Sequence, residues 1–150
     1  MLACGVVAGS TAAARQGQTI VVTDEGGRVL ARLVLDGRQA FSLRYRNSLY
    51  GTLAEERFIV DGGRFRLGEL AAEQLAVLEE YYTVREAPIL GATGWYHAPP
   101  AYELELERLT VAATDLGERT LVVEGHAPVP LWGLAHDARP FVHVEVAQGP

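Results

Sequence analysis

The chain has 150 residues, 49% of them hydrophobic, which suits one folded domain with a sizeable core and excludes a disordered chain. Its net charge is −6, from 13 basic and 19 acidic residues, and every basic residue is an arginine. Because phosphate binding needs concentrated positive charge, this balance argues against a nucleic-acid partner. The single cysteine, Cys4, excludes a disulfide framework within the chain.

Short motifs for catalysis or metal binding are missing from the sequence. There is no G-x-S-x-G elbow, no Walker loop, no H-E-x-x-H and no C-x-x-C. The histidines are too far apart in sequence for a short zinc motif; they are His97, His126, His136 and His143. We therefore expect no catalytic residue, no metal site and no cofactor.

The N-terminal residues 2–14 are uncharged and mostly small or apolar, and three alanines precede Arg15. Small residues at this spacing are typical of signal-peptidase sites, although the usual charged start is missing. Thirteen residues are also too few to span a bilayer. We predict that residues 1–14 are the remnant of an export signal or membrane anchor, with a frayed terminus as the alternative. Residues 15–150 are then a single β domain outside the cytoplasm, periplasmic or otherwise extracytoplasmic.

Two runs rich in apolar and β-branched residues come next, at residues 18–23 and 28–35. They are separated by the sequence from Asp24 to Gly27, whose composition is typical of a hairpin turn. In the second run one parity is apolar and is expected to face the core: Val29, Ala31, Leu33 and Leu35.

The stretch from Phe41 to Val60 predicts two strands joined by a short polar connection. The parity that carries Phe41 and Phe58 also carries polar side chains, namely Tyr45, Asn47 and Glu56. A polar group on an apolar face costs free energy unless it finds a partner. We therefore expect a ligand site or a structural hydrogen-bond anchor here, with Glu56 bonded to backbone amides or to Tyr45, Asn47 and Ser48.

The segment that follows combines two kinds of signal. Asp61-Gly62-Gly63 predicts another hairpin, with residues 64–67 as the returning strand. Helical spacing predicts one short helix within residues 69–80, which we place near Glu69–Gln74, while strand formers favour a strand over Val77–Val84. The Pro- and Gly-rich run at residues 86–100 is expected to be a loop over the core or a site. It carries three cavity or lid candidates, Trp95, Tyr96 and His97.

The C-terminal part alternates strands with turns. Residues 102–111 alternate apolar residues with glutamates, which predicts one strand with a solvent-facing row of carboxylates. Residues 118–124 and 141–146 predict two further strands, with a loop or short turn at residues 132–137. The total of eight or nine short strands joined by Gly-rich turns is typical of an antiparallel β-sandwich or a small β-barrel.

The motif between Tyr45 and Val60 resembles a family known as domain of unknown function 1850. The family pattern is Tyr-x-His-Ser-Val, a Thr-Pro pair, a Glu four residues after the Thr, and then an aromatic residue. The matching residues are Tyr45, Ser48, Thr52, Glu56 and Phe58. Asn47 replaces the family's histidine and Leu53 its proline, and an amide can neither titrate nor ligate a metal strongly. With the late strands included, the resemblance covers roughly Thr19 to Val146.

This resemblance implies a small exported or membrane-anchored bacterial protein. Many family members are encoded beside the membrane subunits of TRAP-type transporters that use the TAXI class of solute-binding protein. The resemblance implies no activity.

Three hypotheses of function remain. The first is a non-catalytic accessory or binding module on the outer side of the cytoplasmic membrane, with TRAP-type transporter subunits or a small ligand as partner. The protein would then associate with the membrane through its N-terminus, if the true start of the chain lies upstream of Met1. The second is a small-molecule-binding β-barrel with a cavity bordered by Tyr45, Asn47, Glu56 and the Trp95 loop. The third is a small hydrolase with Glu56 as general base beside Ser48. The candidate ligand or structural motif is Tyr45, Asn47, Ser48, Thr52, Glu56 and Phe58.

Overall fold

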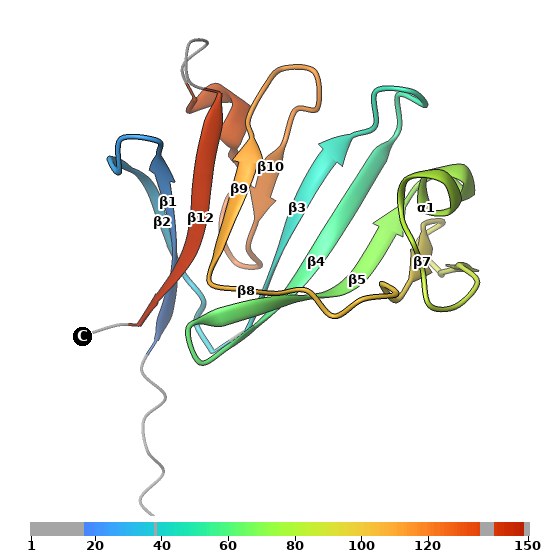
Figure 1. The fold of residues 1–150 in the computed structure, drawn as a ribbon, viewed down its shortest axis with the longest axis horizontal. Helices are drawn as coiled ribbons and strands as arrows, with labels where there is room; N and C mark the ends of the chain where they lie inside the picture. Colours follow the sequence, from blue (N-terminus) through green and yellow to red (C-terminus); the bar gives the residue numbers. More distant parts are fainter. Residues whose placement is uncertain (1–16, 38, 136–139, 149–150) are drawn as a thin grey trace, which may run out of the picture.

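A computed structural model describes residues 17–37, 39–135 and 140–148, and Figure 1 shows their arrangement. The predicted fold class is confirmed, because these residues form two antiparallel sheets packed as a β-sandwich. The small sheet has the order β2-β1-β12-β9, with β1 Gln18–Asp24, β2 Val29–Val34, β9 Arg108–Ala112 and β12 Phe141–Gln148. The predicted export signal at residues 1–14 lies outside the described residues.

The large sheet has the order β11-β10-β3-β4-β5-β7-β6, and β8 also pairs with β5. Its long central strands are β3 Ala40–Arg46, β4 Leu53–Asp61 and β5 Arg64–Ala72. The shorter ones are β6 Ile89–Leu90, β7 Tyr96–Ala98, β8 Glu105–Leu106, β10 Thr120–Val122 and β11 Val129–Pro130. One α-helix, α1 Leu75–Tyr81, and one 3-10 turn, η1 Leu131–Gly133, complete the described elements. None of the described helices is long and apolar enough to cross a membrane.

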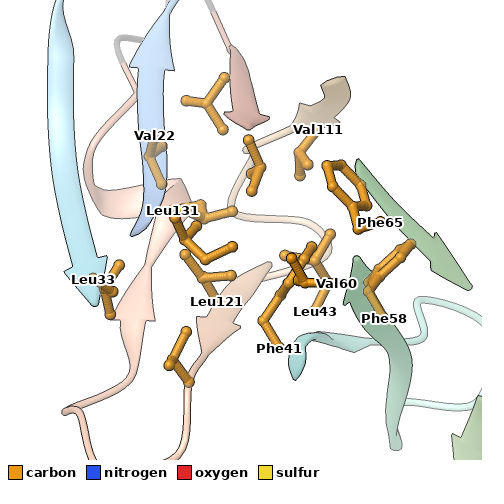
Figure 2. Close-up of a cluster of buried hydrophobic side chains, with 14 of the residues drawn as sticks. Val22, Leu33, Phe41, Leu43, Phe58, Val60, Phe65, Val111, Leu121 and Leu131 are labelled. Carbon is orange, nitrogen blue, oxygen red and sulfur yellow. The ribbon is translucent and has the colours of Figure 1, made fainter. Parts of the chain in front are cut away.

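The core between the two sheets forms around three phenylalanines of the large sheet (Figure 2). Phe41 and Phe58 stack with ring centroids 4.9 Å apart, and Phe65 meets their edges at 5.2 and 5.6 Å. Apolar side chains from the small sheet, such as Val22 and Leu33, close the other side. Alternation along the strands therefore places the predicted apolar parity inside at β3 and at the end of β4.

A β-bulge at Gly68 shifts the parity of β5. Arg57 pairs with Glu69 but the next residue, Phe58, pairs with Leu67, so Gly68 is an extra residue on β5. A Cβ atom at Gly68 would come 2.8 Å from the Ile59 side chain, which explains the glycine. Beyond the bulge the even positions face inward, and Leu70 is fully buried. The predicted short helix within residues 69–80 is confirmed, as α1, but its placement near Glu69–Gln74 is wrong, because β5 continues to Ala72.

Helix α1 covers the part of the large sheet's inner face that the small sheet does not reach (Figure 1). Its Val77 and Leu78 are buried against Leu70 and Ala72 of β5. The predicted strand over Val77–Val84 is wrong, because apolar residues at helical spacing gain more by packing on this second core than by pairing as a strand. Extended backbone begins only at Tyr82, and Val84 forms an isolated bridge with Pro100.

The predicted loop at residues 86–100 contains a hairpin, because β6 and β7 extend the large sheet beyond β5. The predicted single strand at residues 102–111 is interrupted: Tyr102 and Leu104 are 74% and 47% exposed instead of facing the core. Here β8 adds to β5, and after only Glu107 the chain joins the small sheet as β9. This crossover links the sheets at one end, but they do not close into a barrel. The described residues form twelve strands, more than the eight or nine predicted, because short strands such as β6, β7 and β8 were not predicted.

Candidate functional site

A cleft of about 330 Å³ opens over the inner face of the large sheet, between helix α1 and the connection from β9 to β10. One wall comes from the end of β3, its loop and the end of α1: Tyr45, Arg46, Asn47, Ser48, Tyr81 and Tyr82. The facing wall comes from the end of β9 and its connection: Ala112, Thr114, Leu116, Gly117 and Arg119. The cleft exists because the small sheet and α1 cover separate parts of the same face.

Three side chains beneath the cleft form a directed hydrogen-bond chain. The Tyr82 hydroxyl donates to Glu56 Oε1 at 2.9 Å, and the hydroxyls of Tyr45 and Tyr82 are 2.6 Å apart. A phenol has one proton, and the proton of Tyr82 is used on Glu56, so Tyr45 must be the donor to Tyr82. Glu56 thus lies on the inward parity as predicted, but its partner is Tyr82 and not Tyr45, Asn47 or Ser48.

Both phenols are held in their protonated form. Burial raises the pKa of Tyr82 strongly, and the nearby charge of Glu56 raises it further. Burial also raises the pKa of Tyr45, despite the hydrogen bond to Tyr82. The two hydroxyls are therefore fixed donors, not acids that ionise near neutral pH.

Arg119 lies over the ring of Tyr45, with its guanidinium carbon 4.9 Å from the ring centroid. No carboxylate of the described residues pairs with this guanidinium. Arg46, on the wall that carries Tyr45, differs: its side chain donates to Glu118 Oε2 at 3.1 Å and to the carbonyl of Gly51 at 2.8 Å.

Asn47 is buried and anchors the loop from β3 to β4. Its Oδ1 accepts hydrogen bonds from the backbone amides of Leu49 and Tyr50, both at 3.0 Å. Its own amide donates to the carbonyl of Thr52 at 2.8 Å. An amide side chain that accepts from the backbone two and three residues ahead stabilises a turn, so Asn47 holds the loop between β3 and β4.

The other predicted site residues do not gather at one point. Ser48 is exposed in the loop, and the buried Thr52 Oγ1 has no hydrogen bond within the described structure. Phe58 belongs to the central core. Glu56 pairs across β3 with Leu43, five residues before Ser48, so Ser48 and Glu56 are on the order of 15 Å apart at about 3.3 Å per residue.

The three lid candidates also separate. Trp95 ends the turn of the β6–β7 hairpin, where its carbonyl accepts from Gly91 at 2.8 Å. Tyr96 packs beside α1 on the inner face, while His97 lies on the outer face, 2.5 Å from Glu69. None of the three lines the cleft.

A second polar cluster, on the outer face of the large sheet, was not predicted from the sequence. Glu55 is only 6% exposed, and its two oxygens contact Arg44 at 2.6 Å and Arg57 at 3.0 Å. Arg57 also pairs with Glu69 at 3.1 Å. The sequence contains a feature that could have predicted this cluster: when β3 and β4 are paired as a hairpin, the oppositely charged Arg44 and Glu55 are cross-strand neighbours.

Neither a metal-binding arrangement nor a similar known protein indicates the function of the cleft. No group of three or more His, Cys, Asp or Glu side chains gathers in a metal-binding arrangement within the described ranges. The cleft therefore combines aromatic walls, a guanidinium with no carboxylate partner among the described residues and a part-buried hydrogen-bond chain, an arrangement suited to binding a small molecule. No protein-family model, curated protein or solved structure matches the chain.

Proposed function

We propose that the protein is a non-catalytic binding module that holds a small ligand in the cleft between α1 and the β9–β10 connection. The observation that carries this proposal is the cleft itself, about 330 Å³ and walled by Tyr45, Tyr81 and Tyr82. Ligand sites are concave, largely apolar and furnished with a few fixed polar groups, and small ones start near 300 Å³. The fixed phenols of Tyr45 and Tyr82 give this cleft a rigid wall.

The hydrolase hypothesis has less support. A general base must reach the proton that it abstracts, directly or through one water. Glu56 Oε1 is instead occupied by the hydroxyl of Tyr82, and Ser48 lies far along the strand direction. The geometry favours a ligand that is held rather than converted.

The proposal extends to cellular context through the family resemblance. A member of domain of unknown function 1850 would act outside the cytoplasm, exported or anchored through its N-terminus, as an accessory to a TRAP-type transporter. The matching residues Tyr45 and Glu56 support this extension, since Tyr45 lines the cleft and Glu56 is bonded to Tyr82 beneath it.

A titration followed by amide NMR tests the ligand site. The probes are benzoate, benzamide and benzylamine, which share a ring and differ in charge. We expect at least one of them to shift the amides of Tyr81, Thr114 and Gly117. Ala112→Trp, which fills the cleft, should abolish these shifts, whereas Ala92→Trp, on the exposed β6–β7 turn, should keep them. No shift with any probe, or shifts that survive Ala112→Trp, would count against the proposal.

Two further experiments test the context. Alkaline phosphatase fused to the C-terminus should be active, because it needs disulfides that form outside the cytoplasm; an inactive fusion of normal abundance contradicts export. Co-expressed membrane subunits of a TRAP-type transporter should co-purify with the protein in detergent. Loss of the complex in a variant without residues 1–16, but not in Ala92→Trp, would separate N-terminal anchoring from non-specific association.

A further inference from the structure

The cleft contains one cation, Arg119, that pairs with no carboxylate of the described residues. Arg119 is half-buried on the wall that continues into β10, and its guanidinium is held over Tyr45. Other arginines of the large sheet differ from Arg119, because Arg44, Arg46 and Arg57 each pair with a carboxylate. Arg119 has no such partner among the residues that the structure describes.

Several other polar groups of the cleft are already engaged. The proton of Tyr82 is used on Glu56, and that of Tyr45 on Tyr82. The Asn47 oxygen accepts from two backbone amides of its own loop. Glu56 itself is not among the residues that line the cleft, and its Oε1 accepts the Tyr82 proton. The guanidinium of Arg119 is thus the ionic group left to meet a ligand.

A guanidinium presents several N–H donors in one plane, a geometry that matches a carboxylate. The cleft also offers Arg119 apolar surface, from the rings of Tyr45 and Tyr81 and from Leu116, which is 70% exposed. A single guanidinium balances one negative charge. A doubly charged group would meet Glu118, which faces the same region through its pair with Arg46.

Resting on the proposed function, we infer that the ligand is a small organic monocarboxylate with an apolar body. Its carboxylate pairs with the guanidinium of Arg119, and its apolar body packs against the tyrosine rings and Leu116. Arg119 is accordingly the residue that determines specificity for charge.

Isothermal titration calorimetry tests this inference with benzoate, benzamide, benzylamine and phenyl phosphate at low salt. We expect benzoate to bind at least about tenfold tighter than benzamide, because a charge-assisted hydrogen bond is among the stronger polar contacts. Arg119→Gln should weaken benzoate about tenfold and leave benzamide unchanged, and Arg119→Lys should be intermediate. Arg66→Gln is the matched control, since Arg66 is exposed on β5 outside the cleft.

The outcomes separate the two proposals. Binding of benzamide or benzylamine as tight as that of benzoate, or benzoate binding that Arg119→Gln leaves intact, overturns the carboxylate inference while the cleft remains a ligand site. Tighter binding of phenyl phosphate than benzoate would assign the site to phosphate esters and equally overturns it. If none of the four probes binds, the proposed function itself fails. Circular dichroism of each variant confirms that the fold is retained.

Discussion

Tyr82 joins the two ends of the hydrogen-bond chain beneath the cleft, so its hydroxyl should contribute more stability than that of Tyr45. Tyr82→Phe keeps the ring but removes the donor to Glu56 and the acceptor for Tyr45. A hydrogen bond to a charged group contributes about 1.5–3 kcal/mol and a neutral one about 0.5–1.5 kcal/mol. We expect Tyr82→Phe to lower the free energy of unfolding by about 2–4 kcal/mol. Tyr45→Phe, which loses the neutral bond alone, should lower it by about 1 kcal/mol.

Urea denaturation followed by tryptophan fluorescence measures both values, and constant m-values would show that the variants alter stability alone. In the double variant we expect about the same loss as in Tyr82→Phe, because Tyr45 has already lost its acceptor there. A loss in Tyr45→Phe equal to that in Tyr82→Phe, or simple additivity in the double variant, would refute the assigned direction of the chain.

Three other expectations concern stability. Asn47→Ala should lower the free energy of unfolding by about 1–3 kcal/mol, because two loop amides lose their acceptor, while Asn47→Asp, which keeps the acceptor, should lose less; equal losses in urea denaturation would contradict the turn role. Glu55→Gln should lower the free energy of unfolding by about 1–2 kcal/mol; the loss is moderate because the arginine partners of Glu55 are part-exposed and are easily hydrated. An unchanged midpoint of urea denaturation would mean that the outer cluster does not contribute to stability. At alkaline pH the unfolded chain loses the Tyr82 proton first, near pH 10, because the folded pKa is raised. The contribution of protonated Tyr82 to the free energy of unfolding is therefore complete below about pH 10 and falls above it by about 1.4 kcal/mol per pH unit. In Tyr82→Phe the free energy of unfolding should fall less steeply with pH in this range.

The fold class could be predicted because alternation along β3, β4 and β12 is a local property of the sequence. The same parity placed Asn47 and Glu56 on the inward side, where Asn47 is buried and Glu56 is bonded to Tyr82. Parity fails where a strand contains a bulge. Gly68 exchanges the faces of β5, so Glu69 joins the outer cluster and Leu70 enters the core.

Most of the residues that line the cleft could not be predicted from the local pattern of apolar and polar residues in the sequence. Tyr82 follows a helix that forms only because the large sheet leaves its inner face uncovered there. Arg119 comes from a segment that approaches Tyr45 through the pairing of β10 with β3. Both placements depend on contacts between residues far apart in sequence, which period and propensity do not specify.

The proposed function requires that the cleft beside Tyr45 and Arg119 binds a small ligand. A crystal structure of the protein with benzoate, at a concentration close to the dissociation constant measured in solution, tests it most directly. We expect benzoate in the cleft, with its carboxylate within hydrogen-bond distance of Arg119 and its ring against Tyr45 or Tyr81. A cleft without benzoate, or benzoate bound elsewhere on the molecule, would contradict the account.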